Sequence, residues 1–251
     1  MRIIKDIAYN TTHERQKLDL HLPENDEFYA IVFIHGGGLE KGDKANDKSH
    51  FEYLVSKGYA VVAPNYRMYP DAKYPDYVED SAAAVAWAFK HAGEYGKCKG
   101  VIVGGSSAGG YLSMMLCFDK SWLAPHGIDP IQVSAWLHIA GQPTCHFKYL
   151  EAERGVSRNR VIIDETAPLY HIGAEREYSP MLFVVSDNDM KNRYEQTMLV
   201  LSTMKHFGHE EKTSLKMFEG THCQYHNQLD QNGNNILGIA ECEFLERILG
   251  K

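Results

Sequence analysis

The stretch VIVGGSSAGGYLSMML places two adjacent serines, Ser106 and Ser107, among four glycines and between two apolar runs. Glycine and serine in such proportion are also typical of a flexible linker. The flanking residues argue against a linker, because VIV has the pattern of a buried strand and AGGYLSMML has helical spacing. A strand that turns sharply into a helix at a serine, with glycines on both sides, presents a nucleophilic hydroxyl. We therefore predict one nucleophilic serine here.

The spacing of the glycines distinguishes the two serines. With Ser107 at the centre of a Gly-x-Ser-x-Gly pattern, both outer positions are glycine, whereas with Ser106 at the centre the second one is Ala108. The pattern favours Ser107 as the nucleophile and leaves Ser106 as a neighbour that shapes the turn and the substrate pocket. The backbone N–H of Ala108 then starts the next helix, where the helix dipole favours an oxyanion.

A second glycine cluster follows the early apolar run YAIVFI. Here His35 precedes Gly36-Gly37-Gly38, and such a run lets neighbouring N–H groups face one point. Acyl transfer needs donors of this kind, because negative charge builds up on the former carbonyl oxygen. We predict that the N–H groups of Gly37, Gly38 and Ala108 form an oxyanion hole and that His35 braces the loop. The alternative is a plain turn after a strand.

A serine nucleophile needs a base, and the base needs an orienting carboxylate. Asp187 and Asp189 follow the apolar run MLFVVS, and His222 and His226 follow the last run, TSLKMFEG. We favour Asp189, because Asp187 is closer to the strand end and can serve the turn, and His222, which directly follows Gly-Thr. Asp187 and His226 remain alternatives. The cluster of His222, Cys223 and His226 lacks a second ligand pair, so we expect no metal.

Short apolar runs alternate with segments of helical period along the whole chain. The expected strands are 2–9, 16–22, 29–35, 59–66, 100–106, 133–141, 181–187 and 213–220, and the main expected helices are 49–58, 77–92, 108–118, 192–207 and 236–249. This alternation predicts an α/β fold with a mostly parallel central sheet and helices on both faces. Polar residues at the carboxyl ends of its strands would meet at one edge. The segment 142–180 has no clear period and is expected to cover the site partially and to help set specificity.

Composition excludes several other classes of protein. The chain has 251 residues without a linker or repeat, which predicts a single domain over 1–251. A net charge of −7 argues against nucleic-acid binding. No apolar run approaches the roughly 20 residues of a membrane span, and the start lacks a signal-peptide pattern, so we expect no membrane association and a cytoplasmic location. Five scattered cysteines fit a reducing compartment. A homo-oligomer remains open.

Three motifs together resemble a known family. HGGG at 35–38, GSSAGG at 105–110 and NYRMYPDAKYPDYVEDSAAAVAW at 65–87 are similar to motifs of the α/β-hydrolase esterases related to hormone-sensitive lipase. They also resemble the bacterial acetyl-xylan and feruloyl esterase-like and kynurenine formamidase-like branch. The likeness runs from about residue 15 to about residue 245. It implies an α/β-hydrolase fold and a serine hydrolase without a cofactor, but no particular substrate.

The resemblance also implies roles for individual residues. The serine before Ala-Gly-Gly corresponds to Ser107, the acid in the late loop to Asp189, and the late histidine to His222. Arg67 and Asp80 match a structural arginine–aspartate pair. The implied activity is that of a serine carboxylesterase on short-chain acyl esters, with acetylated carbohydrates and aryl acid esters as candidates. The alternatives are an arylformamidase-like amide hydrolase and a catalytically silent binding protein.

Three features depart from the family pattern. Leu39 stands where relatives often have tryptophan, which predicts an altered pocket wall. Ser186 replaces the usual glycine in the loop of the acid. Only about 27 residues precede the first buried strand, so no long cap is expected at that end. A small or open acyl site, partly covered by 142–180, fits these departures.

Overall fold

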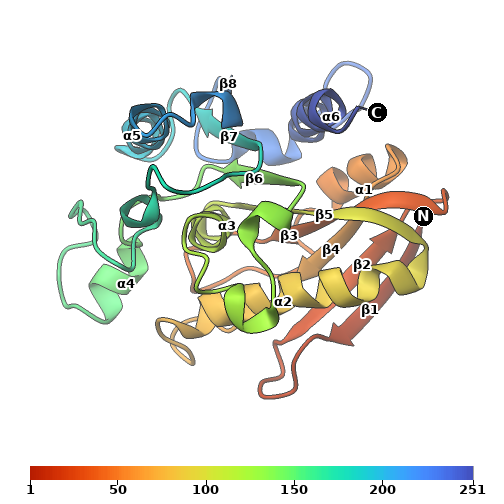
Figure 1. Cartoon of the computed structure of the whole chain (residues 1–251), viewed down its shortest axis with the longest axis horizontal. Helices are drawn as coiled ribbons and strands as arrows, with labels where there is room; N and C mark the ends of the chain where they lie inside the picture. Colours follow the sequence, from red (N-terminus) through yellow and green to blue (C-terminus); the bar gives the residue numbers. More distant parts are fainter. Residues whose placement is uncertain (251) are drawn as a thin grey trace.

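The computed structural model describes residues 1–250 and contains an eight-stranded sheet (Figure 1). The strand order is β1-β2-β4-β3-β5-β6-β7-β8, antiparallel at β1/β2 and β2/β4 and parallel elsewhere. The strands are β1 (Arg2–Ala8), β2 (Lys17–Leu22), β3 (Glu27–Ile34), β4 (Ala60–Pro64), β5 (Lys97–Ser106), β6 (Ala135–Ile139), β7 (Met181–Ser186) and β8 (Thr213–Phe218). This mostly parallel sheet confirms the predicted fold class.

Six α-helices accompany the sheet among the described residues. They are α1 (Lys48–Ser56), α2 (Asp76–His91), α3 (Ala108–Phe118), α4 (Phe147–Ala152), α5 (Arg193–His206) and α6 (Ile236–Leu249). Short 3-10 helices lie in the connections, at Ala92–Tyr95, Ala124–His126, Pro130–Gln132, Pro168–His171, Glu210–Lys212 and Gln224–Asn227. Every strand and helix expected from the sequence is present, with ends displaced by a few residues. Only the short α4 was not predicted as a helix.

The central strands are buried on both faces of the sheet, which explains why they are continuous apolar runs, whereas the edge strands β1 and β8 have no fully buried residue. In β3, Ala30 and Val32 belong to the core cluster that contains side chains of α2, α3 and α5, whereas Ile31 and Phe33 belong to the cluster with α1 and α6. Successive side chains of a strand point to opposite faces, so the central strands β3, β4, β5, β6 and β7 each supply both clusters. In Figure 1, α1 and α6 lie together on one side of the sheet and α2 and α3 on the other.

Four loops leave the carboxyl ends of parallel strands at the same edge of the sheet. They follow β3, β5, β7 and β8, and they carry the glycine cluster, the serine pair, the aspartates and the histidines singled out above. Because β3 is the neighbour of β5 and β7 is the neighbour of β8, the four loops converge. The sheet therefore positions residues that are far apart in the chain.

The segment 142–180 lies beside this edge and has a small apolar cluster of its own, built on Cys145, Leu150 and Ala167. α4 is its only α-helix within the described residues and stands away from the sheet in Figure 1. Ion pairing of Lys148 with Glu40, at 2.6 Å between Nζ and Oε1, ties α4 to the loop after β3. The segment is thus held by contacts distant in sequence.

Candidate active site

Ser107 forms the turn between β5 and α3, with φ of 53° and ψ of −110°. A Cβ atom on Gly109 would lie 1.9 Å from the carbonyl oxygen of Ile34, and one on Gly105 would lie 2.5 Å from the carbonyl oxygen of Gly109. Only glycine tolerates such close approach of three backbone segments. The strained turn therefore needs a glycine two residues before and two residues after Ser107, which is the register that the sequence favoured.

The side chains of Ser107, His222 and Asp189 are connected by two successive hydrogen bonds. His222 Nε2 lies 2.8 Å from Ser107 Oγ, and His222 Nδ1 lies 2.5 Å from Asp189 Oδ1. These residues come from the loops after β5, β8 and β7. Ser106 is buried on the adjoining wall, and it is the hydroxyl of its neighbour Ser107 that donates to His222 Nε2. The structure thus brings together the three residues that the sequence singled out.

Asp189 is held as a carboxylate. Its side chain has no exposed surface, and Oδ1 also accepts a hydrogen bond from the Met190 N–H at 2.6 Å. Burial opposes ionisation, but the hydrogen bond and the charge of His222, with the Met190 N–H, bring the pKa of Asp189 below its ordinary value. An ionised Asp189 keeps the proton of His222 on Nδ1, which leaves Nε2 free to accept the proton of Ser107.

The alternative residues have other partners. Asp187 is exposed, and its Oδ1 accepts a hydrogen bond from the Gly220 N–H at 2.9 Å, which ties the loop after β7 to the loop after β8. Ser186 donates from its hydroxyl to the Thr221 carbonyl at 2.8 Å and supports the same junction. His226 lies with Nδ1 3.3 Å from Asp47 Oδ1 and forms no hydrogen bond with Ser107.

The loop after β3 is braced from inside. His35 Nδ1–H donates to the Gly36 carbonyl at 2.7 Å, and its ring stacks on Tyr66 with 4.4 Å between centroids. Burial lowers the pKa of His35 to about 4, so the ring is neutral near pH 7. This is the bracing role predicted for His35.

Three backbone N–H groups near Ser107 have no hydrogen-bond acceptor within residues 1–250. They are the N–H groups of Gly37, Gly38 and Ala108, the last at the start of α3. Gly37 has φ of +119°, and a Cβ there would lie 1.8 Å from the carbonyl oxygen of Lys41, so glycine is required. Free N–H groups at a helix start and in a tight glycine loop can bind an anionic oxygen.

A cavity of about 600 Å³ lies over Ser107. The glycine loop after β3 and both serines form part of its wall. Phe147 of α4 also lines it, and a Cβ on Gly38 would lie 3.3 Å from Phe147 Cζ. The remaining lining residues come mainly from the loops after β3, β7 and β8 and from the segment after α4: Glu40, Lys41, Gly42, Asn46, Asp47, Arg158, Met190, His222, Cys223, His226 and Asn227.

The prediction that Leu39 forms a pocket wall is wrong. Its side chain is completely buried in the main core cluster, and it does not line the cavity. Leu39 has φ of +64°, a left-handed conformation that continues the turn begun at Gly38; its side chain packs with the core beneath the loop. Phe147 occupies the wall instead. The sequence around it gave no clear period by which its position could be found.

The described residues contain neither a cluster of metal ligands nor a membrane-spanning helix. Within residues 1–250, no group of three or more histidine, cysteine, aspartate or glutamate side chains is arranged to hold a metal ion. In the same range, no helix combines the length and apolar character that a membrane span requires.

Comparison with known proteins relates the chain to esterases. The family model described as BD-FAE matches residues 18–124. The carboxylic ester hydrolase LipN of Mycobacterium tuberculosis is 38% identical over 110 residues, which cover 43% of this chain. That stretch is 29% of LipN, so the likeness spans about three tenths of this curated relative.

Two solved structures are similar over nearly the whole chain. Esterase 2 of Thermogutta terrifontis, phosphorylated by paraoxon, has a TM-score of 0.78 at 25% identity and covers 98% of this chain and 94% of that protein. Esterase B of Lactobacillus rhamnosis has a TM-score of 0.78 at 17% identity and covers 99% of this chain and 85% of that protein. These likenesses confirm the predicted fold. The chain has the α/β-hydrolase fold, and part of its sequence is similar to carboxylic ester hydrolases.

Proposed function

We propose that this protein is a serine carboxylesterase that acts on short-chain acyl esters. The observation that carries the proposal is the hydrogen-bonded line from Asp189 through His222 to Ser107, at 2.5 Å and 2.8 Å. The partial sequence identity to a carboxylic ester hydrolase supports it. Esterase 2 of Thermogutta terrifontis is described with propionate bound, which favours a short acyl group for this chain as well. Acetylated carbohydrates and aryl acid esters remain the candidate substrates.

In the proposed reaction, His222 Nε2 takes the proton of the Ser107 hydroxyl as Oγ attacks the ester carbonyl. The carbonyl oxygen becomes an oxyanion and accepts hydrogen bonds from the N–H groups of Gly37, Gly38 and Ala108. His222 then gives the proton to the leaving alcohol. Water, deprotonated in turn by His222, hydrolyses the acyl-enzyme and restores Ser107. Asp189 holds the imidazole in the required tautomer and stabilises its positive charge in both steps.

The test compares the two adjacent serines. We expect a fluorophosphonate probe to label the wild type and Ser106→Ala but not Ser107→Ala. Ser107→Ala is expected to lower kcat for para-nitrophenyl acetate by about 10⁴–10⁶-fold, because loss of the nucleophile disables the whole relay. Ser106→Ala should stay within about tenfold, since its hydroxyl has no part in proton transfer. Labelling of Ser107→Ala would reject the assignment.

An amide-hydrolysing enzyme can use the same residues. An N-formyl arylamine is therefore assayed beside the para-nitrophenyl esters of acetate, butyrate and octanoate. Higher kcat/KM for the formamide than for every ester would reject the carboxylesterase proposal in favour of an arylformamidase. Absence of labelling and of turnover of both classes would identify a silent binding protein.

A further inference from the structure

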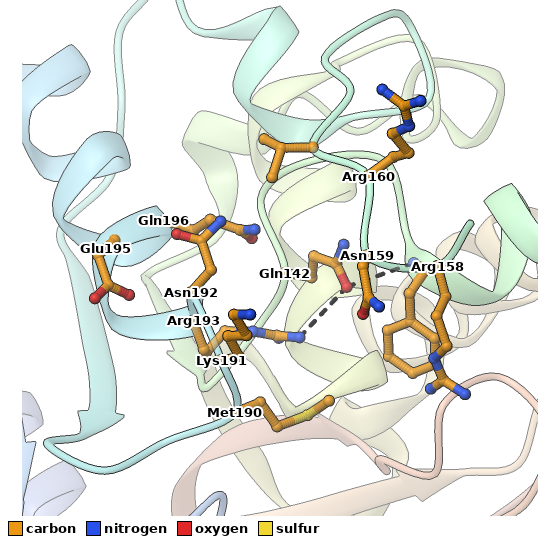
Figure 2. Close-up of a pocket in the computed structure, with 12 residues that line it drawn as sticks. Gln142, Arg158, Asn159, Arg160, Met190, Lys191, Asn192, Arg193, Glu195 and Gln196 are labelled. Carbon is orange, nitrogen blue, oxygen red and sulfur yellow. Dashed lines mark hydrogen bonds between the residues drawn. The ribbon is translucent and has the colours of Figure 1, made fainter. Parts of the chain in front are cut away.

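A second cavity, of about 470 Å³, adjoins the cavity over Ser107. The two share Phe147, Arg158 and Met190 as lining residues, so they lie next to each other on either side of these side chains. Figure 2 shows the residues Arg158 and Arg160 on one side, the start of α5 on the other, and Gln142 between them. A substrate that reacts at Ser107 has room to extend into this second cavity.

The second cavity is lined by positively charged side chains that have no carboxylate partner. Arg158, Arg160 and Lys191 line it, and none of them forms an ion pair within residues 1–250. The acidic side chain on its wall is the exposed Glu195. Because the chain as a whole has a net charge of −7, this local excess of positive charge is not a consequence of composition.

Other cations of the same segment behave differently. Lys148 pairs with Glu40 at 2.6 Å, and Arg154 forms an ion pair with Asp164. The guanidinium of Arg158 instead lies 4.5 Å over the ring of Phe147. Stacking on an aromatic ring leaves the edge of the guanidinium, which carries its N–H donors, available to a carboxylate.

The floor of this cavity is also positive. Arg193 is 4% exposed, and its guanidinium donates to the Ala140 carbonyl at 2.6 Å and to Gln142 Oε1 at 3.3 Å, both uncharged acceptors. An arginine stays protonated in a protein, so its positive charge remains here. Asn192 precedes α5 without a side-chain cap, and the dipole of that helix adds to the positive potential.

We propose that the second cavity binds a carboxylate of the ester substrate, with Arg158 and Lys191 as its principal partners. The inference rests on the proposed esterase activity and specifies its substrate class. The substrates are short-chain esters that carry a free carboxylate on either the acyl or the alcohol part. Phe147 contacts both the glycine loop after β3, at 3.3 Å from a Cβ on Gly38, and Arg158, whose guanidinium lies 4.5 Å from the ring centroid, so the bound carboxylate would lie about one aromatic ring beyond the scissile carbonyl. In Figure 2 the side chain of Arg160 points away from Gln142, and we assign it no direct contact.

The test uses two matched pairs of esters. The para-acetoxybenzoate anion is compared with its methyl ester for the alcohol side, and mono-para-nitrophenyl glutarate with para-nitrophenyl valerate for the acyl side. We expect the anionic member of at least one pair to have a kcat/KM about tenfold higher, the size of a charge-assisted contact in a partly exposed site. The preference should fall when NaCl is raised to about 0.5 M, because salt screens exposed charges.

The double variant Arg158→Gln/Lys191→Gln should lower the ratio of anionic to neutral kcat/KM to about one. Taking this ratio removes any general loss of activity from the comparison. The matched control is Lys205→Gln at the far end of α5, an exposed cation paired with Glu210 at 2.8 Å, and it should leave the ratio unchanged. An equal kcat/KM within both pairs, or a ratio unaltered in the double variant, overturns the inference.

A binding measurement separates this inference from the proposed function. In Ser107→Ala, calorimetric titration with monomethyl glutarate and with methyl valerate measures the preference without turnover. Tighter binding of the glutarate, lost when Arg158 and Lys191 are also replaced by Gln, supports the carboxylate site even if ester hydrolysis fails. Equal binding of both ligands rejects the carboxylate site even if hydrolysis of neutral esters confirms the esterase.

Discussion

Two histidine–aspartate pairs lie close together at the cavity over Ser107. In one, His222 Nδ1 is 2.5 Å from Asp189 Oδ1, and Nε2 reaches Ser107 Oγ. In the other, His226 Nδ1 is 3.3 Å from Asp47 Oδ1, and Nε2 is buried without a hydrogen-bond partner within residues 1–250. The His222 side chain is 23% exposed, whereas that of His226 is 6% exposed.

The difference shows that pairing with a carboxylate does not by itself make a histidine a base. Both rings have an acid on Nδ1, but only the Nε2 of His222 is directed at a hydroxyl. Cys223, with φ of 54°, turns the chain between them, and His226 lies in the 3-10 helix Gln224–Asn227. Its ring packs near Phe33 at 6.0 Å and near His50 at 5.8 Å between centroids. We infer that this second pair is structural.

Replacement of the histidines gives the largest expected contrast. His222→Ala should lower kcat by about 10⁴–10⁶-fold, because the serine then has no base. His226→Ala should lower kcat by less than about tenfold, since its ring transfers no proton. Steady-state kinetics with para-nitrophenyl acetate measures both. A greater loss in His226→Ala would reverse the assignment of the two pairs.

Replacement of the acids gives a smaller contrast. Asp189→Asn should lower kcat by about 10³–10⁴-fold, because the amide no longer favours the tautomer with the proton on Nδ1. Asp47→Asn and Asp187→Asn should each stay within about tenfold. The same assay measures all three variants, and circular dichroism checks that each is folded. An Asp187→Asn variant slower than Asp189→Asn would identify Asp187 as the orienting acid.

The second pair should instead contribute to stability, and with a definite pH dependence. Burial opposes the ionisation of Asp47, but the hydrogen bond and charge of His226 bring its pKa below the ordinary value. A lowered pKa stabilises the fold above the unfolded value of about 3.9, and this contribution is lost as pH falls through the folded pKa.

Asp47→Asn is therefore expected to reduce the free energy of unfolding by about 1–3 kcal/mol at neutral pH. The difference in free energy of unfolding between wild type and variant should shrink as the pH falls below about 3.9. Urea unfolding at a series of pH values measures it. A gap that is constant or grows toward acid pH would show that the charge of Asp47 does not stabilise the fold.

The catalytic candidates were predictable because residues next to them in the sequence identify them. The glycines around Ser107 are required by contacts as short as 1.9 Å between a hypothetical Cβ and Ile34 O, and such a requirement is visible as a spacing. Asp189 and His222 were predictable from their places after strand ends. The preference for Asp189 over Asp187 and for His222 over His226 rested only on small differences in position after the strand end. Which group each imidazole contacts appears only in the structure.

Leu39 and Phe147 show the limit of this reasoning. Leu39 has a positive φ and its side chain lies in the core, and no residue spacing reports this backbone conformation. The segment 142–180 lacks a period, so neither α4 nor its contact with the loop after β3 through Lys148 and Glu40 was predicted.

The sequence by itself determined the alternation of strands and helices, the turn at Ser107 and the set of residues able to form a relay. These follow from side-chain periodicity and from steric limits on neighbouring residues, which act locally. The tertiary structure alone decided which imidazole faces Ser107, which side chains wall the cavity, and that Arg158 and Lys191 line the same second cavity without carboxylate partners. Those outcomes depend on how segments distant in the chain pack together, and no local pattern records them.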